Sequence, residues 1–305
     1  MIQNDFINPE TPLVSIALCT YNGEKFIKSQ LDSILKQTYS NLEIIICDDG
    51  STDQTLSILN RITDPRVKIF RNSTNIGLVD NFFKAISLST GKYIALSDQD
   101  DYWLPIKIEE LILNIGDNLL IYCDSAFTHE NGDLMDRNLS ENRRMYSGDD
   151  NRVFAIPKLG FLFGHTLLFK SELKTKILPY PAIYHDFWIG FVASSEGSII
   201  YLNEALVHYR QHDSSATNSQ RLILHPNHKK NKKEEELREW ISFLNKYQGG
   251  KNKNFFTDFL RYLNNGQKYW GKTQLILFYF VHSKILFYTK SKFLSRINIV
   301  RKLIN

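Results

Sequence analysis

Along the first 123 residues, the spacing of apolar positions switches repeatedly between short continuous runs and a three-to-four-residue period. The runs are typical of buried strands, and the longer period is typical of helices. We predict strands over residues 13–19, 42–47, 67–70, 92–96 and 119–123. We predict helices that start at Asn22, at Ser51, at Gly77 and near Pro105. This alternation is typical of βαβ units, so we predict an α/β fold with a mostly parallel central sheet flanked by helices.

The pattern changes after residue 123. Residues 124–155 are polar and irregular, which predicts a loop, and apolar pieces return over 156–210. Residues 225–233 are polar and basic, and helical spacing dominates from Glu234 onward. We therefore predict two domains: an α/β domain over residues 1–224 and a basic, aromatic-rich helical extension over 225–305.

The net charge of +4 conceals an asymmetry between these two parts. Residues 225–305 carry 17 Lys and Arg against 5 Asp and Glu, whereas residues 1–224 carry 20 against 28. The three cysteines, Cys19, Cys47 and Cys123, fall in apolar runs without C-x-x-C spacing, which indicates buried thiols in a reducing compartment. We find no signal peptide at the N-terminus and no apolar run long enough to span a bilayer, so we expect a cytoplasmic protein.

A cluster of carboxylates directly follows the apolar run at 92–96. Asp98, Asp100 and Asp101 occupy three of four consecutive positions. Like charges this close repel one another, and a divalent cation relieves the repulsion while it binds substrate phosphates. We interpret Asp100 as a direct metal ligand, Asp98 as a contact to the metal or a ribose, and Asp101 as the alternative start of the next helix. An acidic, solvated turn is the alternative.

Two further polar turns follow predicted strands. Thr20-Tyr21-Asn22-Gly23 offers an aromatic ring for stacking on a nucleobase, or is an ordinary Asn-Gly turn. Asp48-Asp49-Gly50-Ser51-Thr52-Asp53 offers carboxylates to a base or ribose, or is a capped strand-to-helix turn. The chain has neither G-x-G-x-x-G after its first strand nor a P-loop, which disfavours a dehydrogenase or a P-loop NTPase.

These three turns, at these spacings, resemble family 2 glycosyltransferases of the GT-A fold. The Asp-Gln-Asp-Asp-x-Trp variant resembles the subgroup of bacterial rhamnosyltransferases that build cell-wall and surface polysaccharides. Two later segments extend the resemblance, which covers roughly residues 12–218: Tyr184-His185-Asp186-Phe187-Trp188 and Tyr209-Arg210-Gln211-His212-Asp213. The sequence departs from many relatives at Cys19, where they have a threonine or serine, and over residues 214–218.

The resemblance implies a role for each matching residue. Asp186 corresponds to the general base that takes the acceptor proton in an inverting transfer. The divalent metal, Mn²⁺ or Mg²⁺, is expected at Asp100, Asp98 and His212, where it stabilises the departing diphosphate. The donor site is expected to contain Cys19, Tyr21, Asn22, Asp48, Asp49, Asp98, His185 and Arg210.

The implied activity is that of a metal-dependent, inverting hexosyltransferase. We predict transfer of a sugar, rhamnose from dTDP-rhamnose in the first instance, to a growing lipid-linked polysaccharide or cell-wall glycan. The alternatives are a UDP-hexose donor, a non-catalytic nucleotide-sugar-binding or assembly module, and a metal-dependent phosphohydrolase. Residues 251–305 interleave aromatic and basic side chains, which favours peripheral contact with the inner face of the cell membrane. Packing on the catalytic domain or on a second subunit is the alternative, and nucleic-acid binding is disfavoured.

Overall fold

The computed structural model describes residues 11–143, 145–156, 161–181, 185–213, 229–247, 251–265, 269–282 and 285. Several features predicted above lie outside these ranges: Tyr184, residues 214–218, the domain boundary at 224/225, and the aromatic residues beyond 285.

Four parallel strands form the first half of the sheet, as predicted. They are β1 (Val14–Thr20), β2 (Leu42–Asp48), β3 (Val67–Arg71) and β4 (Tyr93–Ser97), in the order β3-β2-β1-β4. Strands β1, β2 and β4 are buried along their full length, which explains why they appear in the sequence as continuous apolar runs.

The second half of the sheet is mixed. It contains β5 (Tyr102–Trp103), β6 (Leu120–Thr128), β7 (Leu134–Asn138), β8 (Leu167–Lys170) and β9 (Ile199–Arg210). Strand β8 runs antiparallel between β4 and β6, β9 runs parallel to β6, and β5 pairs antiparallel with β9. The predicted loop at 124–155 was partly wrong, because β6 extends to Thr128 and pairs with β7. Strand β7 is largely exposed, so it has no apolar run to reveal it.

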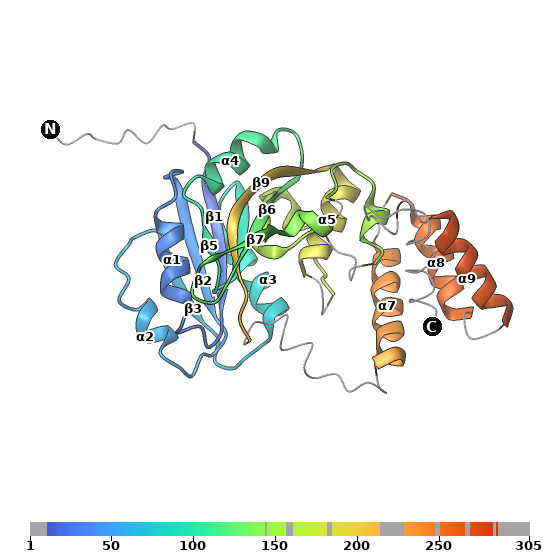
Figure 1. Ribbon diagram of the computed structural model, residues 1–305, viewed down its shortest axis with the longest axis horizontal. Helices are drawn as coiled ribbons and strands as arrows, with labels where there is room; N and C mark the ends of the chain where they lie inside the picture. The colour runs from blue at the N-terminus through green and yellow to red at the C-terminus, as the bar shows by residue number, and fades with distance from the viewer. Residues whose placement is uncertain are drawn as a thin grey trace.

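Helices cover both faces of the sheet (Figure 1). The helices along the sheet are α1 (Ile27–Leu35), α2 (Thr55–Leu59), α3 (Leu78–Leu88), α4 (Lys107–Ile115) and α5 (His185–Glu196). One hydrophobic core joins α1 and α4 to the sheet, and a second core joins α3 and α5 to the other face. Helix α4 begins at Lys107, so Pro105 lies just before the helix rather than within its first turn.

Three helices form the C-terminal part of the described chain: α7 (Lys229–Lys246), α8 (Lys253–Asn265) and α9 (Tyr269–Val281). They lie beyond α5 in Figure 1. Trp188 of α5 packs edge-on against Phe243 of α7 at 4.8 Å, and Phe191 of α5 packs against Phe256 of α8 at 5.5 Å between ring centroids. The helical character predicted for this region is confirmed. Among the residues described, no helix is both long and apolar enough to cross a membrane.

Candidate functional site

The acidic turn, residues 98–101, lies between β4 and β5, at the carboxyl end of the parallel strands where α/β folds place ligands. Arg210, at the end of β9, holds this turn through its backbone and its side chain. Its backbone N–H donates to Asp101 Oδ1 at 3.3 Å, and its Nε donates to the carbonyl of Asp100 at 2.9 Å. Arg210 Nη1 also donates to the carbonyl of Glu130 at 2.6 Å. The observed contacts of Arg210 therefore shape the acidic turn.

Asp100 and His212 are brought together from positions far apart in the sequence. His212 Nε2 lies 2.8 Å from Asp100 Oδ2, and both side chains are largely buried. The His212 ring packs against Phe26 with 4.7 Å between centroids, which fixes its orientation. Two of the three predicted metal ligands are therefore adjacent.

Asp101 and His165 form a second group with Asp98. Nδ1 of His165 lies 3.8 Å from a carboxylate oxygen of each aspartate, and one potential ligand atom from each of the three residues lies within 4.8 Å of the others. The same oxygen of Asp101, Oδ2, is buried and has no hydrogen-bond partner among the described residues. Asp101 is fully buried before β5, so the alternative that it begins the next helix was wrong.

His165 is not among the residues predicted from the sequence. It stands in an apolar stretch and belongs to the short 3₁₀-helix Gly164–Thr166, which enters β8. Its Nε2 lies 3.0 Å from the Ser125 hydroxyl on β6, and this contact orients the ring toward the aspartates. No spacing signal links His165 to the acidic turn, because strand pairing alone brings them together.

A buried lysine supplies positive charge behind these carboxylates. Lys107 is fully buried at the start of α4 and donates from Nζ to the carbonyl of His165 at 2.7 Å. Its Nζ also lies 3.2 Å from the centroid of the Trp103 ring, a close cation–π contact. Desolvation lowers the pKa of Lys107 to about 7 and that of His165 to about 3.

Crowded charge also changes the acidity of the carboxylates. Desolvation, followed by the negative charges of Asp100 and Asp186, raises the pKa of Asp98 to about 7. Its side chain is still 35% exposed, so the neighbouring charges are an essential part of this shift. Desolvation and the charges of Asp100 and Asp98 likewise raise the pKa of Asp101 well above its ordinary value. A bound cation would reverse these shifts, because it favours the ionised carboxylates.

The donor set fits a hard or borderline divalent ion. Carboxylate oxygens suit Mg²⁺ and Mn²⁺, and a neutral imidazole adds a ligand that Mn²⁺ accepts readily. The acidic turn presents carboxylates with raised pKa values and one buried oxygen without a hydrogen bond. Both features are what a cation would relieve, so Asp98, Asp101 and His165 fit a divalent metal, and of these three only Asp98 is among the predicted ligands Asp98, Asp100 and His212.

Hydrogen bonds connect the turn after β1 with the turn after β2. The Ser51 hydroxyl and backbone N–H both donate to the Asp48 carboxylate, at 2.5 and 3.0 Å. Asn22 has a φ of 47°, its backbone N–H donates to Ser51 Oγ at 2.9 Å, and its side chain accepts from the N–H of Thr52 at 2.9 Å. Asp48 and Asn22 thus position the two turns, and their direct contact with a donor remains a prediction.

Asp49 organises the next connection. Its carboxylate accepts from Asn72 Nδ2 at 2.8 Å and from the backbone N–H groups of Ile76 at 2.8 Å and Gly77 at 2.9 Å. These bonds hold the segment between β3 and α3 against β2. Three donors hold this carboxylate in a fixed position, and its contact with a base remains a prediction.

Gln99 links the first turn to the acidic turn. Its Oε1 accepts from Thr20 Oγ1 at 2.7 Å and from the N–H of Tyr21 at 2.9 Å, while its Nε2 donates to the Tyr21 carbonyl at 3.1 Å. The Tyr21 side chain is 45% exposed, so its ring is available for stacking. Cys19 is buried in β1, where burial raises the pKa of its thiol well above the ordinary value.

Asp186 and His185 open helix α5. Asp186 accepts from the N–H of Phe187 at 2.8 Å in the first helical turn, and its charge contributes to the raised pKa of Asp98. The charges of the two carboxylates therefore interact, and the role of Asp186 as general base remains a prediction. The His185 ring is stacked on Phe82 at 4.4 Å, and its Nε2 has no hydrogen-bond partner among the described residues.

Comparison with known families accounts for this arrangement. Residues 15–177 match the model described as "Glycosyl transferase family 2". The chain belongs to glycosyl transferase family 2. An "Uncharacterized glycosyltransferase" of Haemophilus influenzae is 32% identical to it over 227 residues, which cover 68% of each protein.

Other relatives of this family 2 glycosyltransferase have more informative names. The Escherichia coli protein named "UDP-Glc:alpha-D-GlcNAc-diphosphoundecaprenol beta-1,3-glucosyltransferase WfaP" is 44% identical over 100 residues, 33% of this chain and 40% of that protein. In structure, TarS of S. aureus in complex with UDP-GlcNAc aligns with a TM-score of 0.61 at 18% identity, covering 87% of this chain and 79% of that one. The mannosyltransferase PcManGT of Pyrobaculum calidifontis, in complex with GDP-Man and Mn²⁺, aligns at 0.53 and 14% identity, with 96% and 80% covered. These structural likenesses confirm the predicted GT-A fold.

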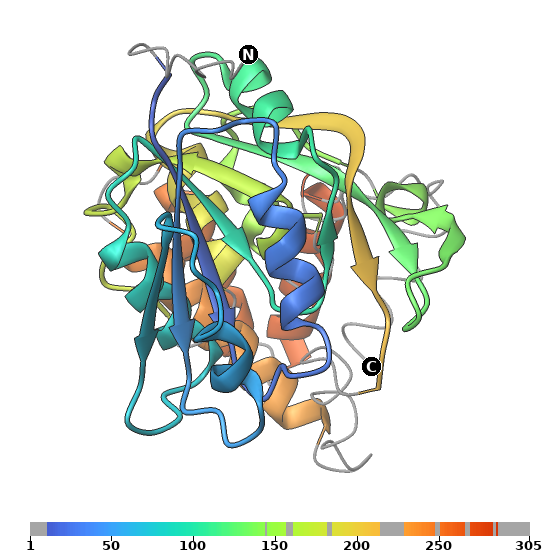
Figure 2. The same ribbon diagram turned by 90° about the vertical axis from the view of Figure 1, so that its left-hand side faces the viewer.

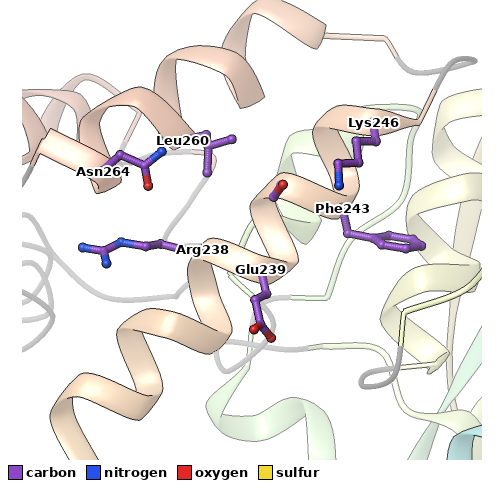
Figure 3. A pocket seen from close by; sticks show the side chains of 7 residues that line it. Arg238, Glu239, Phe243, Lys246, Leu260 and Asn264 are labelled. Carbon is purple, nitrogen blue, oxygen red and sulfur yellow. The ribbon is translucent and has the colours of Figure 1, made fainter.

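The glycosyltransferase also has an open hollow of about 430 Å³ between α7 and α8, lined mainly by the residues labelled in Figure 3. Arg238 and Lys246 contribute positive charge there, and Glu239 opposes it. The hollow contains none of the residues of the acidic turn, and nothing in its lining matches the chemistry predicted from the sequence.

Proposed function

We propose that this glycosyltransferase moves a hexose from a nucleotide-sugar donor to a lipid-linked sugar acceptor, with inversion at the anomeric carbon. One observation carries the proposal: Asp100 and His212 lie 2.8 Å apart at the end of β4, and the charge of Asp186, from α5, reaches the same turn. A metal-ligand pair beside a separate carboxylate is the arrangement that a diphosphate donor and an acceptor hydroxyl require.

In this mechanism the acceptor oxygen attacks the anomeric carbon on the face opposite the nucleoside diphosphate. Asp186 accepts the hydroxyl proton as the new C–O bond forms, and the bond to the diphosphate oxygen breaks. Asp100, His212 and Asp98 would hold Mn²⁺ or Mg²⁺, whose positive charge stabilises the departing diphosphate. Asp49 and Tyr21 recognise the base, the former through its carboxylate and the latter by stacking.

The donor sugar has two candidates. The sequence Asp98-Gln99-Asp100-Asp101 resembles rhamnosyltransferases, which favours dTDP-rhamnose. The name of WfaP specifies UDP-glucose, which favours a UDP-hexose. Thymine and uracil present the same imide edge, so Asp49 serves either donor. The reference to diphosphoundecaprenol in the same name supports a lipid-linked acceptor.

We also propose that the enzyme works as a peripheral protein on the inner face of the cell membrane. Ile276, Leu277 and Val281 are exposed on α9, and basic residues outnumber acidic ones 17 to 5 beyond residue 224. Exposed apolar side chains within a basic region are the features that bind an anionic lipid surface.

Thermal denaturation with a donor panel tests the proposed function. Purified protein with Mn²⁺ is melted in the presence of dTDP-rhamnose, UDP-glucose, UDP-galactose, UDP-N-acetylglucosamine or GDP-mannose. A donor at about 100 times its dissociation constant adds roughly 2.7 kcal/mol, which a melt resolves. We expect stabilisation by a dTDP- or UDP-linked donor that is lost in Asp100→Asn and kept in the control Asp117→Asn, whose side chain is exposed beyond α4.

Three results would contradict the proposal. If no donor stabilises the protein, with or without metal, the chain does not contain the proposed donor site. Release of free sugar or phosphate as fast without an acceptor as with one would indicate the phosphohydrolase. Donor binding without turnover on any acceptor would favour the non-catalytic binding module.

A further inference from the structure

A row of aromatic rings leads away from the acidic turn. It begins at His165, whose Nδ1 lies 3.8 Å from the Asp98 carboxylate. Tyr209 of β9 stacks on the His165 ring with 4.6 Å between centroids, and Phe127 of β6 follows at 5.5 Å from Tyr209. The row therefore connects the carboxylate cluster with the end of strand β6.

Strand pairing places the outer two rings side by side. Phe127 and Tyr209 are partners in the parallel register of β6 and β9, so their side chains emerge on the same face of the sheet. Both rings are only partly buried, whereas most large aromatic residues of the two cores are buried. The planes of these two half-exposed rings are tilted by 46°, so the rings form an angled apolar surface beyond His165 and the acidic turn.

An arginine lies at the far end of this row. Arg137, on the exposed strand β7, has its guanidinium carbon 4.2 Å from the centroid of the Phe127 ring. Figure 2 shows the β6–β7 hairpin, in green, at the edge of the sheet. Arg137 forms no ion pair with any carboxylate in the described part of the chain. A guanidinium that stacks on a ring through its flat face retains its N–H edge for a phosphate.

We propose that Tyr209, Phe127 and Arg137 form the acceptor platform of this enzyme, and that its ligand is a sugar diphosphate attached to a lipid. The proposal rests on the function proposed above and identifies the acceptor class. Carboxylates, rings and guanidinium follow one another in the same order as the hydroxyl, sugar ring and diphosphate of such an acceptor. The apolar C–H face of the sugar lies on the rings, and the diphosphate binds Arg137.

Two short soluble probes test the platform: N-acetylglucosaminyl diphosphate carrying a geranyl chain, and the same geranyl glycoside without phosphates. Their dissociation constants are measured by calorimetry on protein treated with a chelator, so that no metal holds the diphosphate. We expect the diphosphate probe to bind at least about tenfold more tightly than the glycoside, the effect of one charge-assisted hydrogen-bond pair.

Arg137→Ala is expected to abolish this preference, because it removes the guanidinium from an exposed position. The matched control is Arg261→Ala on α8, which removes another exposed arginine stacked on an aromatic ring, Tyr262, at 5.1 Å. This control should keep the full preference. Tyr209→Leu should weaken the binding of both probes by a similar factor, because it removes the aromatic ring and leaves Arg137 in place.

Equal affinity of the wild-type protein for both probes, or no binding of either, would overturn the platform. An unchanged preference in Arg137→Ala would also overturn it, and this exposed variant is not expected to disturb folding. The donor melts separate the two proposals. If a donor still stabilises the protein but the probes do not bind as expected, only the acceptor platform is contradicted. If no donor stabilises the protein, the proposed function itself is contradicted.

Discussion

The turns after β1 and β2 and the acidic turn after β4 lie at the same end of one sheet, yet they handle charge in opposite ways. Asp48 and Asp49 each accept hydrogen bonds from neighbouring donors, and Asp49 alone accepts three. In the acidic turn, Asp101 has a buried oxygen with no hydrogen-bond partner in the part of the chain that the structure describes, and the pKa of Asp98 is raised to about 7. The first region is complete before a ligand arrives, whereas the second carries an electrostatic cost that a ligand can relieve.

This difference suits the turns after β1 and β2 to recognition of a ligand and the acidic turn to chemistry. A base pocket gains affinity when its groups are already held in place, because little further ordering is needed on binding. A transfer site gains from groups whose charges are balanced only when cation and substrate are present. Lys107 is buried behind these carboxylates, and because desolvation lowers its pKa to about 7, it offsets only part of their negative charge near neutral pH.

The sharpest test of this comparison is Asp186→Asn. It should reduce turnover by about 10³-fold, because the acceptor proton loses its base. Donor-dependent thermal stabilisation should remain at the wild-type level, since the nucleotide turns and metal ligands are unchanged. Initial rates and melts measure the two effects separately, with Asp117→Asn as the control. Turnover that stays within about tenfold of wild type would assign the base to another group.

A smaller effect is expected from Asp49→Ala, which changes the turn after β2, where the carboxylates already accept hydrogen bonds. It leaves the donors of Asn72, Ile76 and Gly77 without their acceptor, so the free energy of unfolding should fall by about 2–3 kcal/mol. Urea denaturation measures the loss. The control Asp32→Ala removes an exposed pair with Lys28 on α1 and should cost about 0.5 kcal/mol or less. Equal losses in the two variants would refute the claim that Asp49 organises this region.

The smallest effect is a dependence on pH in chelator-treated protein. Because Asp98 has a pKa near 7 in the folded state and about 4 when unfolded, the unfolded chain loses its proton first as pH rises. The contribution of Asp98 to stability is therefore present at low pH and lost between about pH 4 and about pH 7. We expect the melting temperature to fall by about 2 °C more across this window than in Asp98→Asn. Added Mn²⁺ should remove the difference, and an identical slope in both proteins would contradict the raised pKa.

The sequence allowed the nucleotide side of the fold to be predicted well for a physical reason. Buried parallel strands are continuous apolar runs, and each functional turn directly follows one of them, so position along the chain reveals position in space. His165 and Lys107 were not predicted in this way. His165 meets the acidic turn because β8 inserts antiparallel between β4 and β6, and Lys107, at the start of α4, donates to the His165 carbonyl there.

The same limitation applies to β7 and the acceptor platform. Strand β7 is exposed along most of its length, so no periodic apolar signal marks it. Phe127 and Tyr209 are 82 positions apart and become neighbours through the register of β6 and β9. Local pattern contains no information about such pairing. The predicted extent of the helical extension and the roles of individual site residues also remain predictions.

The packing of Trp188 and Phe191 against α7 and α8 bears on how such enzymes diversify. These rings lie on the helix that begins with His185 and Asp186, so the C-terminal helices support the outer side of α5. A recombination event that exchanged only the C-terminal helices would therefore present α5 with a mismatched surface. Successful exchanges should carry compensating substitutions on α5, so a change in the C-terminal helices would be inherited together with small adjustments in the position of Asp186, the proposed base.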